Sequence, residues 1–142
     1  MSVELPVAPV DTLIRRRAKD LRVSQDAAEE LARRIQERGA TLAADAAERA
    51  RAEGRKTLMV EDFADDVTGD EDIVLPVAPV DRIARLDIPE EFRVAADARV
   101  ALAARLERWG ESVAEGARVL AEHAGRRTIQ EEDIETYLRL VE

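Results

Sequence analysis

Side chains that could make or break covalent bonds are scarce in this chain of 142 residues. It contains no cysteine, so it can form neither a disulfide nor a thiolate metal site. A single histidine, His123, leaves no histidine cluster for a metal ion, and neither a glycine-rich phosphate loop nor a nucleophile–base pair appears. We therefore predict that the protein is not an enzyme and that it uses no cofactor and no metal ion.

The chemistry that remains is that of charge. Aspartate and glutamate number 31 and lysine and arginine 22, which gives a net charge of −9, and Lys19 and Lys56 are the only lysines. We expect such an acidic, lysine-poor composition in a protein that works in concentrated salt. Net negative charge argues against contact with nucleic acid, unless a local basic edge makes the contact and the acids lie on another face.

Nothing in the sequence indicates a membrane protein or an exported one. No apolar run approaches the roughly 18 residues that a membrane span requires, and the first residues lack the basic region of a signal peptide. We expect a soluble cytoplasmic protein with no membrane partner and no small-molecule substrate.

One sequence unit occurs twice in the chain. Residues 5–11, Leu-Pro-Val-Ala-Pro-Val-Asp, return unchanged as residues 75–81. A second pair of similar segments, Gly-Arg-Lys-Thr at 54–57 and Gly-Arg-Arg-Thr at 125–128, recurs with one residue of slippage. Because an internal repeat of this kind indicates two copies of one structural unit, we assign the same fold and the same role to each half.

Each half predicts a short helix, a long helix and a second short helix. Ser24 suits the N-cap of the first long helix, and Gly54 and Gly125 suit the C-terminal stops of the two long helices. Apolar residues of the second long helix recur at intervals of three and four, which gives one continuous apolar stripe. The expected helices run from Pro6 to about Asp20, Gln25 to about Ala52, Val60 to about Val67, Pro76 to about Leu86, Ala96 to about His123, and Gln130 to Leu140.

Neither half is expected to fold alone. A long helix with an apolar stripe cannot bury that stripe against two short helices, and about 70 residues lie near the lower limit for a self-sufficient core. We therefore expect an all-α fold in which the two halves pack across each other within one chain. The predicted boundaries are 1–68 for the first unit, 69–74 for a linker and 75–142 for the second unit.

The repeated segments resemble archaeal histones. In the first half the resemblance is carried by residues 4–10, by Arg22-Val23-Ser24, and by residues 54–57 followed by Glu61-Asp62. In the second half, residues 120–129 with Glu132-Asp133 match the end of the family's long helix and its last helix. The resemblance covers almost the whole chain and arises independently in both halves, so the chain resembles a fused histone doublet of the kind found in salt-loving archaea.

The resemblance implies two tandem histone folds that form an intramolecular pseudodimer. Such a protein would bend or wrap double-stranded DNA around its outer edge without strong sequence specificity. It would contribute to chromatin organisation and associate with the chromosome in the cytoplasm. Histones hold DNA through inserted arginines, hydroxyl groups and main-chain N–H groups, without reading bases.

Three clusters along one edge are expected to contact DNA. In a crossed pseudodimer the joint after one short helix lies beside the joint after the other half's long helix, and the two first helices approach each other at a third place. By resemblance, Arg22 and Arg93 would point into the minor groove. The full set is Arg15, Arg22, Lys56, Thr57, Arg82, Arg85, Arg93, Arg127 and Thr128. From residue type alone, ordinary solvated arginines would be the more common interpretation, and the doublet motif reverses that preference.

Two further sets of residues are expected to serve structure and assembly. Arg55 and Arg126 each have an aspartate seven residues on, Asp62 and Asp133, which predicts two structural Arg–Asp pairs and not DNA contacts. In the second half, Leu120 and His123 lie where the family joins one dimer to the next, whereas the first half has Arg49 and Ala52 there. We expect two doublets to associate through their second halves and growth to stop at the first halves.

A second function class stays open at this stage. Affinity driven by phosphate contacts falls steeply with ionic strength, so a protein with this composition could act sparsely in a salty cell. The alternative is a histone-fold module that regulates transcription through protein contacts, with weak or sparse DNA binding.

Overall fold

The computed structural model describes residues 3–63 and 73–142. Within these residues the chain forms α1 (Val7–Arg17), α2 (Gln25–Ala52), the 3-10 turn η1 (Val60–Phe63), α3 (Val77–Ala84), α4 (Ala96–His123) and α5 (Glu131–Val141). The all-α class and the repeated short–long–short pattern are confirmed. Of the helix expected over 60–67, only the first turn is described. The rest of it and most of the linker at 69–74 lie outside the described residues.

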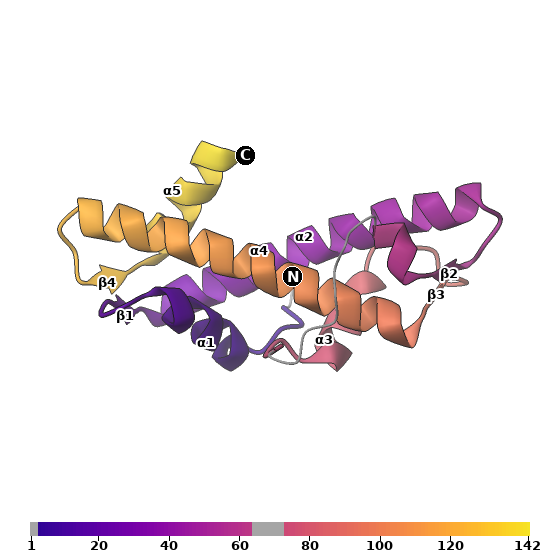
Figure 1. Cartoon of the computed structure of the whole chain (residues 1–142), viewed down its shortest axis with the longest axis horizontal. Helices are drawn as coiled ribbons and strands as arrows, with labels where there is room; N and C mark the ends of the chain where they lie inside the picture. The colour runs from indigo at the N-terminus through magenta and orange to yellow at the C-terminus, as the bar shows by residue number, and fades with distance from the viewer. Residues whose placement is uncertain (1–2, 64–72) are drawn as a thin grey trace.

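The two halves clasp each other. The long helices α2 and α4 cross near their middles, and α1 and α3 lie together on one side of the crossing (Figure 1). Four two-residue strands, β1 (Arg22–Val23), β2 (Thr57–Leu58), β3 (Arg93–Val94) and β4 (Thr128–Ile129), form two short parallel pairs. β1 pairs with β4 and β2 with β3, so each pair joins one half to the other. The expected intramolecular pseudodimer is therefore the observed arrangement.

Local sequence explains where the long helices begin and end. The Ser24 hydroxyl accepts a hydrogen bond from the backbone N–H of Ala27 at 3.2 Å and caps α2, as predicted. Gly54 and Gly125 follow the two long helices with φ of 75° each, a conformation that a residue with a side chain rarely adopts. Both long helices therefore stop at corresponding positions and release the chain into β2 and β4.

The core is shared, and its two long helices contribute unequally. Most buried residues of α2 are alanine, whereas α4 also buries Leu102, Leu106 and Val113. Near the crossing, a Cβ added to Gly39 would lie 2.8 Å from Ile83 of α3 and 3.0 Å from Leu106. This close approach explains why a glycine stands in the middle of a helix, where it is otherwise unfavourable.

Ion pairs tie α1 to α4. Arg16 contacts Glu107 at 3.0 Å and Glu111 at 2.8 Å, and Arg17 contacts Glu111 at 2.7 Å. The buried Glu107 also accepts the backbone N–H groups of Val74 and of the residue after it, at 2.8 and 3.0 Å. In the described part of the chain, no helix combines the length and the apolar character that crossing a bilayer would need.

Candidate nucleic-acid interface

Two of the three expected clusters are built by the parallel strand pairs. At one end of the molecule, Arg22 lies opposite Thr128, and its backbone N–H donates to the carbonyl oxygen of Arg127 at 2.9 Å. At the other end, Arg93 lies opposite Thr57, and its backbone N–H donates to the carbonyl oxygen of Lys56 at 2.8 Å. Main-chain hydrogen bonds thus bring together cations and hydroxyl groups from opposite halves, as the sequence predicted. We call these two clusters the rim ends.

The third cluster lies on the first helices, α1 and α3, between the rim ends (Figure 1). Arg15 is exposed on α1, and Arg82 and Arg85 are exposed at the end of α3. Glu4, just before α1, forms an ion pair with Arg82 at 3.0 Å, which ties the starts of the two units together. We call Arg15, Arg82 and Arg85 the rim centre, and the rim ends and the rim centre together the rim.

Each arginine of the rim centre already has a carboxylate partner. Arg15 Nε lies 2.6 Å from Asp11, and Arg85 Nε lies 3.0 Å from Asp81. With Glu4 beside Arg82, the rim centre holds three cations and three acids. Sequence reasoning missed these partners, although the four-residue spacing of Asp and Arg in both halves is a signal for such pairs.

The two expected Arg–Asp contacts are present at the joints behind the rim ends. Arg55 donates to both carboxylate oxygens of Asp62 at 2.7 Å each, and Arg126 donates to both of Asp133 at 2.6 Å each. The hydrogen bonds from Arg55 hold the pKa of Asp62 below its usual value, although burial acts in the opposite direction. Asp62 also accepts the backbone N–H of Met59 at 2.7 Å. These arginines therefore lock the turns and are engaged away from the rim.

The expected association face differs between the halves. In the second half, Leu120 is half-buried and His123 is exposed, beside Val119, which is 50% exposed. In the first half, the guanidinium of Arg49 donates to the backbone carbonyl of Asp62. The first half therefore presents a charged group, bound to its own last turn, where the second half presents apolar side chains and an imidazole.

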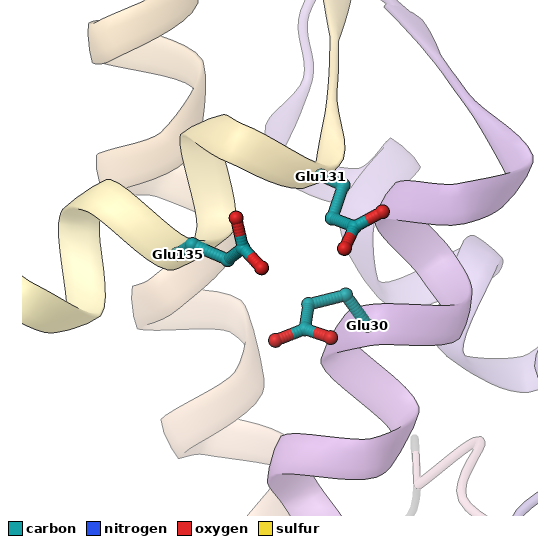
Figure 2. A group of neighbouring side chains, drawn as sticks. All are labelled: Glu30, Glu131 and Glu135. Carbon is teal, nitrogen blue, oxygen red and sulfur yellow. The ribbon is translucent and has the colours of Figure 1, made fainter.

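A group of carboxylates lies where α5 packs beside the start of α2. Oxygen atoms of Glu30, Glu131 and Glu135 lie within 4.8 Å of one another (Figure 2). Burial and the neighbouring Glu135 and Glu30 raise the pKa of Glu131. Such a set has the chemistry of a cation site, but Glu30 is already bound by Arg33 at 2.6 Å and Arg34 at 2.7 Å. We therefore assign no ion to it.

Comparison with known proteins gives consistent matches. A family model described as histone-like transcription factor (CBF/NF-Y) and archaeal histone matches the chain twice, over residues 3–65 and 73–138. One of the chains of archaeal histone HAN1 from Thermococcus zilligii is 48% identical over 60 residues, which are 42% of this chain and 87% of that protein.

Solved structures resemble the whole chain. The crystal structure of the histone from Methanopyrus kandleri has a TM-score of 0.70 and 28% sequence identity, and the match covers 94% of this chain and 92% of that one. A crystal structure of a protein from Thermus thermophilus has a TM-score of 0.72 over 97% of both chains. Its sequence identity of 22% indicates a shared fold and no more.

Proposed function

We propose that this chain, which belongs to the family of histone-like transcription factors (CBF/NF-Y) and archaeal histones, is a fused histone doublet of the haloarchaeal type. It bends or wraps double-stranded DNA along the rim without strong sequence specificity, and it contributes to chromatin organisation on the chromosome. The family is one of DNA-binding structural proteins and not of enzymes.

The observation that carries this proposal is the pairing of the joints at the rim ends. Each end combines cations with a threonine hydroxyl, and each draws them from both halves through backbone hydrogen bonds. In the proposal, Arg22 and Arg93 enter the minor groove where it faces the protein. Lys56, Thr57, Arg127 and Thr128 hold the adjacent phosphates. Arginine insertion with phosphate contacts, and without base readout, suits a protein that follows DNA shape.

The net charge of −9 limits the strength of this binding but does not oppose it locally. At about 1 M salt the screening length is only about 3 Å, so acids elsewhere on the surface act weakly on a duplex held at the rim. The same screening and the release of counterions reduce phosphate-driven affinity. We therefore expect modest affinity in a salty cell.

The acidic composition and the transcription factors in the same family favour a second candidate function. In it, the doublet is a regulatory module that acts through protein contacts at sparse sites. Nuclease digestion of the source organism's chromatin separates the two. Regular protected fragments support packaging, whereas isolated protected sites, or none, support regulation.

Self-association belongs to the proposal as well. Two doublets meet through Leu120 and His123 of their second halves, and assembly stops there because Arg49 and Ala52 cannot supply the same contact. The expected product is a closed pair of chains on DNA. Sedimentation in high salt with DNA tests this, and open-ended polymers would contradict it.

The decisive experiment measures DNA affinity against salt concentration for wild type and for the Arg22→Ala/Arg93→Ala variant. We expect the variant to bind more weakly and its plot of log affinity against log salt to flatten by about two units, roughly one for each lost contact. Arg108→Ala/Arg139→Ala is the matched control, because it removes two exposed arginines outside the rim. Equal binding by wild type and the rim variant at every salt concentration would refute the assignment.

A further inference from the structure

We infer that Asp11, Asp81 and Glu4 suppress DNA binding at the rim centre, so that a duplex is held mainly by the two rim ends. This inference rests on the proposed DNA-binding function. It assigns to the three acids a role in setting both the affinity and the salt dependence of the contact.

The charge at the rim centre is compensated at short range. Asp11 lies 2.6 Å from Arg15, Asp81 lies 3.0 Å from Arg85, and Glu4 lies 3.0 Å from Arg82. Asp81 also lies 3.6 Å from the half-buried Arg99, whose guanidinium donates to the carbonyl oxygen of Val94. All three exposed arginines of the rim centre therefore have a carboxylate in direct contact.

The rim ends are different. Arg22, Lys56, Arg93 and Arg127 are exposed, and none of them forms an ion pair with another residue in the ranges 3–63 and 73–142. A phosphate that approaches a rim end meets cations whose counterions come from the solution. A phosphate that approaches the rim centre meets cations whose counterions are part of the protein.

The ion pairs themselves are easy to open. An exposed pair four residues apart on a helix contributes only about 0.3–0.5 kcal/mol, so a phosphate can displace the carboxylate from Arg15 or Arg85. The displaced carboxylate nevertheless stays one helical turn away, where it repels the phosphate. Suppression therefore comes from the acid that remains and not from the strength of the pair.

Counterion exchange makes this effect measurable. A phosphate contact normally gains free energy by releasing condensed cations from the DNA. At the rim centre the displaced Asp11 or Asp81 takes up a cation from solution, which cancels the release. Contacts there contribute little to the salt dependence, and the slope of log affinity against log salt reports the rim ends.

The test replaces the two helical acids in the full chain. For Asp11→Asn/Asp81→Asn we expect tighter binding to duplex DNA and a salt slope steeper by about two units, since each freed arginine adds nearly one unit. The control Asp45→Asn/Glu48→Gln changes the net charge equally, at acids of α2 outside the rim. An unchanged slope in the rim variant, or an equal gain in the control, would overturn the inference.

A double-mutant cycle gives a second measurement that does not depend on the first. Arg15→Ala should leave DNA affinity nearly unchanged in the wild-type background and should lower it several-fold in the Asp11→Asn background. A loss in the wild-type background as large as that of Arg22→Ala would also overturn the inference. If Arg22→Ala/Arg93→Ala binds like wild type, the proposed function fails. If that variant is impaired while the acid variants change nothing, only the present inference fails.

Discussion

The two contacts between a first helix and the opposite long helix occupy corresponding places but are built differently. Where α1 meets α4, Arg16 and Arg17 bind Glu107 and Glu111 at 2.7–3.0 Å. At the corresponding positions the second half has Leu86 and Asp87 after α3, and α2 has Gln36 and Ala40. No ion pair of this kind joins α3 to α2 among the residues that the structure describes.

The difference teaches that a repeated sequence does not make the two contacts interchangeable. Exchanging the first helices would place two arginines against an amide and an alanine, and an aspartate against Glu107 and Glu111. Like charges in such positions are destabilising. Each half is therefore adapted to the other, and the contacts near Glu107, Gly39 and Glu111 are where the comparison is most open to experiment.

The largest expected effect is at Glu107. Glu107→Ala should lower the free energy of unfolding by about 3 kcal/mol, because it removes the acceptor of two backbone N–H groups and a partner of Arg16. Gln36→Ala, at the matching position, should cost only about 1 kcal/mol, because Gln36 accepts one backbone N–H, that of Glu4. Urea denaturation of both variants provides the measurement, and equal losses would mean that the contacts are equivalent after all.

A smaller effect is expected at the two mid-helix glycines. Gly39→Ala should cost about 2 kcal/mol, because its Cβ would lie 2.8 Å from Ile83 and 3.0 Å from Leu106. At Gly110 the nearest atoms are 3.2 Å away on Ile35 and 3.4 Å away on Leu13. The gain in helix propensity of about 1 kcal/mol should therefore leave Gly110→Ala within about 0.5 kcal/mol of wild type. Thermal unfolding of the pair would contradict this if Gly110→Ala proved the worse.

The smallest expected effect concerns acid. Burial acts to raise the pKa of Glu111, but hydrogen bonds from Arg17 and Arg16 outweigh it and hold the pKa below its usual value. Its contribution to stability is therefore present above the unfolded pKa of about 4.3 and is lost as the pH falls through the lower folded value. Glu111→Gln should reduce the acid-induced fall in Tm, by the equivalent of less than about 1 kcal/mol. A fall in Tm identical to wild type between neutral and acidic pH would exclude this role.

Helix positions could be predicted where local chemistry determines them. The predicted bounds of α2 and α4 agree with the structure, because Ser24 and the two glycines fix ends that do not depend on distant contacts. The prediction for α3 was too long. It ends at Ala84, since the N–H groups of Arg85 and Leu86 donate to carbonyl groups three residues back and close a turn.

The candidate interface was predictable in its placement but not in its charge balance. The neighbours at the rim ends followed from one assumption, a crossed pair of repeats, and the strand register agrees with it. The acid at Glu4 could not be foreseen beside Arg82, because that contact joins positions far apart in sequence. Asp11 and Asp81 stand one helical turn from their arginines and could have been identified from spacing alone.

The strand pairs have a consequence for how the protein responds to dilution. Two histone-fold subunits on separate chains come apart as their concentration falls, because their association is bimolecular. Here both partners of β1–β4 and of β2–β3 belong to one polypeptide, so closing them is a first-order process. The midpoint of unfolding should not shift with protein concentration, and even a scarce copy in the cell would keep its binding edge assembled.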